Sequence, residues 1–315
     1  MPKKIIHNPN RDYEKLDPNY VMMISSMFLN TILGIFETMR TKRLSITMLI
    51  AVLTLSLALP TAAIASPNEN ANNNALDNSK FEIPKNAVQI APGIYSLGTA
   101  QVDGKTVEGI MALHHRDGHT GGPGGGEDTT SSCFSYIGGR AVPWTSVEPW
   151  VVNPTNSFGI SDNDVKTILS DSIQKWEDES SSDILGDGTI VNTPLAADTA
   201  SPDGVNEVYF GNIVDENVIA VTIVWGVFNG PPFAKALTEW DQIYDSDGDW
   251  NWATNEDLNS MDFENVATHE LGHSVGMGHA GDTCEEETMF WATSNGDISR
   301  RSLHTGDIAG IQQLY

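Results

Sequence analysis

The run His269–His279 reads H-E-L-G-H-S-V-G-M-G-H and holds three histidines and one glutamate. On a helix, His269 and His273 lie four residues apart on one face, so both imidazoles can reach the same metal ion. Glu270 lies beside them without being a ligand, and its carboxylate is free for acid–base chemistry. This spacing predicts a zinc site with an adjacent general base.

A third ligand requires the helix to end soon after His273, because the next turn of a straight helix does not bring another side chain to the same ion. Gly276 can take the left-handed conformation that often ends a helix, and His279 can then return to the metal. Three protein ligands leave the fourth position open for water, which distinguishes a catalytic zinc from a structural one. The H-E-x-x-H run alone also occurs by chance on amphipathic helices, but the added glycine and histidine favour a metal site.

Two helices are predicted around this motif. Met261–Thr268 supplies a helix start, with Ser260 or Asp262 as the N-cap. A longer helix upstream begins at Ser161 and Asp164 in a pattern similar to a capping box. Its apolar residues recur at i, i+3 and i+4, namely Val165, Ile168, Leu169, Ile173 and Trp176.

Beyond the histidines, the chain resembles the metzincin metalloproteases, whose signature H-E-x-x-H-x-x-G-x-x-H is followed by a methionine turn. The sequence Thr288-Met289-Phe290 is similar to that turn, in which the family places a methionine beneath the zinc-binding histidines. The ending Gly306–Tyr315 is similar to the D-I-x-G-I-Q-x-L-Y ending of matrixin catalytic domains, a helix that packs under the turn. The resemblance spans about Cys133 to Tyr315.

The resemblance implies an α+β, zincin-like catalytic domain with a twisted mixed sheet, two long helices and a small C-terminal subdomain. It also implies one catalytic Zn²⁺, a protein or peptide substrate, and hydrolysis by a zinc-bound water that Glu270 activates. We expect a monomer. Two alternatives stay open: a catalytically inactive, zinc-stabilised binding or adhesion domain, and a non-peptide amidase that uses the same site. Glu270 speaks against the inactive domain, because a structural zinc site has no need of that carboxylate.

The chain departs from the matrixin pattern in three places, one of which is Ala280-Gly281 after His279, where a matrixin usually has serine or threonine. No P-R-C-G-x-P-D cysteine switch precedes the domain, so latency through a zinc-bound thiol is not carried over. The proline that usually follows the methionine turn is missing from Phe290-Trp291-Ala292-Thr293. The resemblance therefore does not predict the wall of the primed-side specificity pocket.

Two apolar segments are expected as strands of the domain. Val218–Val224 is a continuous apolar run, typical of a buried strand. Leu237–Tyr244 alternates between apolar and polar residues, which predicts a more exposed strand. Metzincins bind extended substrate along an edge strand, and we expect Leu237–Tyr244 to be that edge.

The N-terminal composition indicates export. Basic residues at 40–43, an apolar stretch at 44–59 and the pattern Ala63-Ile64-Ala65 predict a signal peptide that starts at Met39 and is cleaved after Ala65. Residues 1–65 are therefore assigned to an N-terminal extension and a signal peptide. We expect a secreted protein with no stable membrane anchor in the mature chain.

Charge excludes some partners. The chain has 42 acidic and 17 basic residues and a formal net charge of −25. Nucleic acid and anionic membranes would be repelled by such a surface. Nucleic acid is therefore not expected as a partner.

The chain has two cysteines, Cys133 and Cys284. In an exported protein, two cysteines most simply form one disulfide. The alternative is that Cys133 is a regulatory zinc ligand, but its surroundings lack any switch motif.

Residues 66–132 are predicted to be a propeptide or small accessory region ahead of a catalytic domain at 133–315. Val88–Leu113 predicts two or three short strands with a turn at Asp103-Gly104, and Gly118–Ser132 is a glycine-rich linker. We expect this region to be separable from catalysis. Three of its histidines, at positions 114, 115 and 119, are either metal ligands or, in the favoured interpretation, solvated side chains.

A short acidic run suggests a calcium site. Asp245, Asp247 and Asp249 have spacing similar to a calcium loop, but Trp250 stands where an EF-hand needs glycine. The run therefore does not match the EF-hand pattern. An irregular Ca²⁺ site and a solvated acidic turn are the two remaining interpretations.

Overall fold

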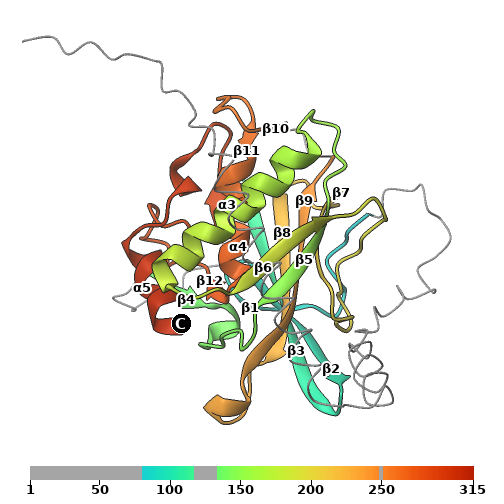
Figure 1. Ribbon diagram of the computed structural model, residues 1–315, viewed down its shortest axis with the longest axis vertical. Helices are drawn as coiled ribbons and strands as arrows, with labels where there is room; N and C mark the ends of the chain where they lie inside the picture. Colours follow the sequence, from blue (N-terminus) through green and yellow to red (C-terminus); the bar gives the residue numbers. More distant parts are fainter. Residues whose placement is uncertain (1–79, 117–132, 248–250) are drawn as a thin grey trace, which may run out of the picture. The chain divides into compact units, whose positions relative to one another are not determined.

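A mixed nine-stranded sheet organises the computed structural model, which describes residues 80–116, 133–247 and 251–315 (Figure 1). The strands are β1 (Val88–Ala91), β2 (Ile94–Val102), β3 (Lys105–Arg116), β5 (Glu148–Asn153), β6 (Leu185–Ile190), β7 (Asn206–Gly211), β8 (Val218–Val227), β9 (Ala236–Asp245) and β13 (Ala292–Thr293). Their order is β1-β2-β3-β8-β9-β7-β5-β6, and β13 pairs with β3. Strands β6, β5, β7 and β9 are parallel to one another, whereas β8, β3, β2 and β1 follow in this order, each antiparallel to the strand before it.

Short elements complete the described fold. The two-residue strands are β4 (Ser135–Tyr136), β10 (Trp252–Ala253), β11 (Met261–Asp262) and β12 (Met277–Gly278). The 3₁₀ turns are η1 (Ile137–Gly139), η2 (Pro232–Ala234) and η3 (Ser299–Arg301). Strand β12 pairs antiparallel with β4, and β10 pairs in parallel with β11.

Three helices accompany the sheet: α3 (Asp162–Ser180), α4 (Phe263–Ser274) and α5 (Thr305–Leu314). Both predicted helix starts are confirmed. The Ser161 hydroxyl accepts from the Asp164 amide at the start of α3, and Asp262 accepts from the Asn265 amide at the start of α4. The α+β class expected from the sequence is confirmed.

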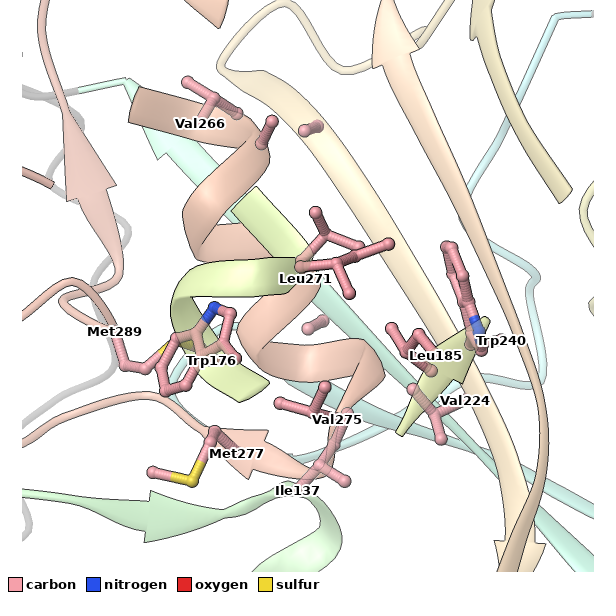
Figure 2. Close-up of a cluster of buried hydrophobic side chains, with 14 of the residues drawn as sticks. Ile137, Trp176, Leu185, Val224, Trp240, Val266, Leu271, Val275, Met277 and Met289 are labelled. Carbon is pink, nitrogen blue, oxygen red and sulfur yellow. The ribbon is translucent and has the colours of Figure 1, made fainter. Parts of the chain in front are cut away.

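The core that positions α4 lies between this helix, α3 and the sheet (Figure 2). Leu271 of α4 and Val275 at its C-cap are fully buried, as are Val224 and Trp240 of the sheet. Trp176 of α3 is also fully buried, and its indole N–H donates to the Thr268 carbonyl at 2.9 Å. Because α4 is held by apolar contacts on both sides, its polar residues keep a fixed position relative to the sheet.

The assignment of Leu237–Tyr244 as an exposed edge is wrong. The corresponding strand, β9, lies between β7 and β8 and is almost entirely buried. Its alternating polar residues suggested exposure, but Glu239 accepts a hydrogen bond from the Gly204 amide, and Asp241 accepts from the amides of Asp198 and Glu207. Buried acceptors with such partners produce the same alternation as a solvated face.

Strands β2 and β3, which precede the expected catalytic domain in the sequence, belong to the central sheet. The β2–β3 hairpin has the predicted turn, with φ of 50° at Asp103 and 76° at Gly104. However, β3 pairs with β8 from Glu108 to His115, so both strands belong to the central sheet. The reason is apolar burial, because one face of β2 and β3 packs in the same cluster as β8 residues.

The interpretation of the upstream histidines as solvated is wrong for the two that the structure describes. His114 is fully buried and His115 is 8% exposed. His119 lies outside the described residues, as do the predicted signal peptide and the glycine-rich linker. Among the described residues, no helix is long and apolar enough to cross a membrane.

Cys133 and Cys284 form a disulfide, as expected from the sequence. Cys133 comes just before β4, which pairs with β12. Cys284 lies in the segment between His279 and Met289. The bond therefore joins the two sides of the small C-terminal part of the domain.

We predict that peptide mapping without reduction recovers Cys133 and Cys284 as one linked species. Reduction should lower the free energy of unfolding by about 2–5 kcal/mol, because it restores chain entropy to the unfolded state. Denaturant unfolding with and without reductant measures this change. A Cys133→Ser/Cys284→Ser variant is the control, because its stability should not respond to reductant. Two free thiols in protein prepared under oxidising conditions would contradict the prediction.

Candidate active site

Helix α4 places His269, Glu270 and His273 in a fully buried region. The helix ends where Gly276 takes a φ of 105°, a conformation that side-chain-bearing residues rarely adopt. A Cβ at this glycine would also lie 2.9 Å from the Leu314 side chain, so both conformation and space favour glycine. The chain then continues as β12 and delivers His279 to the same region.

Backbone carbonyls orient all three imidazoles. The Nδ1–H groups donate to three carbonyl oxygens: His269 to Thr288 at 2.7 Å, His273 to Met277 at 2.9 Å and His279 to Pro92 at 3.0 Å. A carbonyl oxygen can only accept, so Nδ1 carries the proton in each ring. Each Nε2 therefore carries a lone pair, which is the form that binds a metal ion.

The three rings bring ligand atoms within 4.8 Å of one another. The Nε2 atoms of His273 and His279 lie 3.2 Å apart, and no described residue offers a hydrogen-bond partner to the buried His269 Nε2. Two nitrogens bound tetrahedrally to zinc at about 2.0–2.1 Å lie about 3.3 Å apart. The donor set therefore fits one zinc ion.

Burial keeps these histidines neutral. It lowers the pKa of His273 to about 4 and lowers the pKa values of His269 and His279 well below the ordinary histidine value. Metal binding needs the neutral imidazole, so the burial of the site and its ligand chemistry agree.

Glu270 is held on both carboxylate oxygens. The Thr222 hydroxyl of β8 donates to Oε2 at 2.5 Å, and His114 Nδ1 of β3 lies 3.0 Å from Oε1. Burial raises the pKa of Glu270 to about 8, while the hydrogen bond from Thr222 acts in the opposite direction. In this setting the carboxylate is a better proton acceptor than a solvated glutamate.

Met289 is fully buried and packs against α4 at Gly272, beside Trp176 (Figure 2). Helices α3 and α4 approach closely at Gly272 of α4. A Cβ added to this glycine would contact the Met289 sulfur and lie 2.6 Å from the ring of Trp176 in α3. The Asp307 carboxylate of α5 accepts from the amides of Thr288 and Met289 at 2.7 and 3.1 Å. The last helix thus fixes the turn, and the turn carries the carbonyl that orients His269.

Sequence reasoning did not assign Thr222, and it interpreted His114 as solvated. Thr222 is the one polar residue in the run V-I-A-V-T-I-V-W, and a polar side chain in a buried strand needs a partner. His114 follows the apolar stretch Ile110–Leu113, which suits a buried position. Both signals were present, but only the strand pairing brings them to Glu270.

Asp198, Glu239 and Asp241 form another group with metal-ligand spacing, with oxygens within 4.8 Å of one another. Glu239 is fully buried, and its Oε1 has no hydrogen-bond partner among the described residues. Burial raises the pKa of Glu239 to about 9 and that of Asp198 to about 6, and it raises the pKa of Asp241. The alternation Glu239-x-Asp241 in β9 was the available sequence signal.

The calcium site expected at Asp245, Asp247 and Asp249 stays a prediction. Asp245 is buried and accepts from the Ile213 and Asp247 amides, and Asp249 lies outside the described residues.

We predict a pH-dependent stability difference between wild type and Glu239→Gln in chelator-treated buffer. Because the folded-state pKa of Glu239 is raised, the folded state binds its proton more tightly than the unfolded state does. Its stabilising contribution is full below the unfolded pKa of about 4.5 and is lost as pH rises through about 9. The melting temperature of Glu239→Gln minus that of wild type should therefore increase from pH 5 to pH 9.

Differential scanning calorimetry measures this difference. The control is Glu285→Gln, which removes one negative charge at an exposed position. Its melting temperature minus that of wild type should not change with pH. A Glu239→Gln difference that stays constant from pH 5 to pH 9 would contradict the prediction.

Comparison with known proteins agrees with this geometry. The family model of matrixin peptidases matches residues 232–315, which include α4, the third histidine, the methionine turn and α5. Human matrilysin is 41% identical over 75 residues, which cover 24% of this chain and 26% of matrilysin. The Arabidopsis thaliana metalloendoproteinase 2-MMP is 28% identical over 160 residues, which cover 48% of this chain and 37% of that protein.

The match extends over about a quarter to two fifths of these relatives' lengths. A second Arabidopsis thaliana protein, metalloendoproteinase 5-MMP, is 34% identical over 121 residues, or 33% of its length. The matched segments, the mixed sheet with its helices and the converging histidines point to the same family. The chain therefore contains a matrixin-like metzincin catalytic domain.

Proposed function

We propose that the chain is a secreted zinc-dependent endopeptidase. The observation that carries the proposal is the convergence of three buried imidazoles, each oriented by a backbone carbonyl, beside the buried carboxylate of Glu270. His269, His273 and His279 would hold the metal. Three protein ligands leave room for water and for a substrate carbonyl.

A bound zinc ion would supply a water of lowered pKa and a Lewis acid for the peptide carbonyl. Glu270 would accept a proton from the attacking water and deliver it to the leaving amine. Thr222 supports this role, because its hydrogen bond to Oε2 fixes the carboxylate plane. Met289 and Gly276 are proposed as structural supports, beneath the histidines and at the end of α4.

The two other functions considered from the sequence predict different behaviour. A zinc-stabilised binding or adhesion domain would bind zinc but leave peptides intact. A non-peptide amidase would hydrolyse small amides but not peptide bonds. The buried position of Glu270, with hydrogen-bonding partners on both oxygens, favours a catalytic role over a purely structural site.

The remaining assignments are part of the same proposal. Residues 1–65 are an extension with a signal peptide, residues 66–132 are a propeptide or small accessory region with a glycine-rich linker, and residues 133–315 are the catalytic part. The substrate is a protein or peptide, and the mature chain is a secreted monomer without a nucleic-acid partner. Incubation with a diverse peptide mixture, followed by mass spectrometry of the cuts, separates a peptidase from an amidase and from an inert binder.

We predict that Glu270→Gln retains zinc but lowers kcat by about 10²- to 10⁴-fold, the range for loss of a general base. The substitution keeps the size of the side chain and an oxygen for Thr222. Steady-state hydrolysis of a peptide and metal analysis of the same sample check it. The exposed Glu285→Gln is the control, with unchanged activity. Wild-type activity in Glu270→Gln would rule out the proposed base.

We predict that His279→Ala binds zinc more than about 100-fold more weakly than wild type, because it removes a direct ligand, whereas loss of a supporting residue costs 10- to 100-fold. Competition with a chromogenic chelator measures the zinc affinity. His304→Ala, a histidine at the start of α5, is the matched control. One tightly held zinc per chain in His279→Ala would show that another residue is the third ligand.

A further inference from the structure

Resting on the proposed function, we infer that β3 is an inhibitory strand of the folded chain. It occupies the place along β8 that an extended substrate needs, and His114 fills the space at Glu270. The folded chain is therefore latent, and hydrolysis requires β3 to leave β8.

The first observation is the position of β3 relative to the catalytic carboxylate. Thr222 of β8 contacts Glu270, and its pairing partner across the ladder is Ala112 of β3. Strand β3 pairs antiparallel with β8, and it pairs in parallel with β13, which follows the methionine turn. The cleft between β8 and β13, where a peptide backbone could pair with β8, is filled by the chain itself.

The second observation is the side chain that this strand inserts. His114 is fully buried, and its Nδ1 lies 3.0 Å from Glu270 Oε1. Its ring centroid lies 3.9 Å from that of His269, with the two ring planes tilted by 32°. A general base must come within about 2.6–3.2 Å of the proton that it accepts. His114 holds this position at Oε1, so water and substrate are excluded from it.

The third observation concerns the β1–β2 turn. The Pro92 carbonyl accepts from His279, and a Cβ at Gly93 would lie 3.0 Å from the His279 ring. The β1–β2 turn, which belongs to the same N-terminal segment as β3, therefore covers His279. With His269, Glu270 and His273 fully buried, no catalytic side chain is open to a polypeptide.

The competing interpretation is that β3 is a permanent strand and His114 a catalytic or positioning residue. Its support is apolar burial, because Met111 and Leu113 of β3 pack in one cluster with Ile223 and Trp225 of β8. Against it stands a steric argument. One edge of β8 cannot hold both β3 and a substrate strand, so a permanent β3 would leave Glu270 without access to an extended peptide.

Two substitutions in the full, zinc-loaded chain separate the two interpretations. His114→Ala removes the contact with Glu270. Gly109→Val loosens the strand far from the catalytic residues, because a Cβ at Gly109 would lie 2.8 Å from the Trp225 ring. Lys105→Ala, at the exposed start of the same strand, is the control.

The expected result is low peptidase activity in wild type and in Lys105→Ala. His114→Ala should raise kcat/KM by about 10- to 100-fold, the range for losing a hydrogen bond to a charged group. Gly109→Val should also raise kcat/KM. A folded His114→Ala protein with lower activity than wild type would overturn the inference, because His114 would then assist catalysis.

Hydrogen exchange gives a second measurement that does not depend on turnover or on the folding of Gly109→Val. A short peptide hydroxamate, which binds zinc and extends along the cleft, is added to wild type. Exchange of the amides at 105–116 should speed up as the probe binds, because probe and β3 compete for β8. Bound probe with unchanged protection of β3 would overturn the inference.

These outcomes also separate this inference from the proposed function. Rapid peptide hydrolysis by wild type with β3 still protected would overturn only the inhibitory role. A zinc-loaded wild type and His114→Ala that both leave every peptide intact would overturn the peptidase and its inhibition together.

Discussion

The orientation of three imidazoles by backbone carbonyls is the constraint on which the site depends. Each Nδ1–H group is bonded to a carbonyl from a different part of the chain: the methionine turn, the turn after α4 and the β1–β2 turn. Burial removes water as an alternative partner. The tautomer of each ring in the described fold is therefore set by its carbonyl partner, and a change in the methionine turn or in the turn after α4 would misplace His269 or His273.

The remaining architecture can be understood as support for those carbonyls. Asp307 of α5 binds the amides of the methionine turn, and so holds the partner of His269. The β4–β12 pairing and the Ser135 hydroxyl, which donates to the His279 carbonyl at 2.8 Å, fix the return of the chain after Gly276. The buried side chains of Trp176 and Met289 pack against α4 and fix its position relative to α3 and the methionine turn. Local hydrogen bonds thus define the directions, and apolar packing defines the distances.

The sequence predicted the parts of the site that depend on local spacing. His269, Glu270, His273 and Gly276 follow from the geometry of one helix and its end, and the caps of α3 and α4 follow from their first residues. Strand neighbours could not be predicted in the same way, because pairing joins residues far apart in sequence. His114 and Thr222 reach Glu270 only through the β3–β8 register. Strand β9 was misplaced because hydrogen-bonded carboxylates and solvated ones give the same alternation.

The disulfide has a mechanical consequence for the departure of β3. Cys133 is the first described residue after β3 and the glycine-rich stretch, and it is covalently joined to Cys284. A pull on the N-terminal strands is therefore transmitted along the chain to this cross-link and not to β4, β12 or the bonds around His279. The disulfide therefore allows β1, β2 and β3 to separate from β8 while the β4–β12 pairing beside the metal site stays in place.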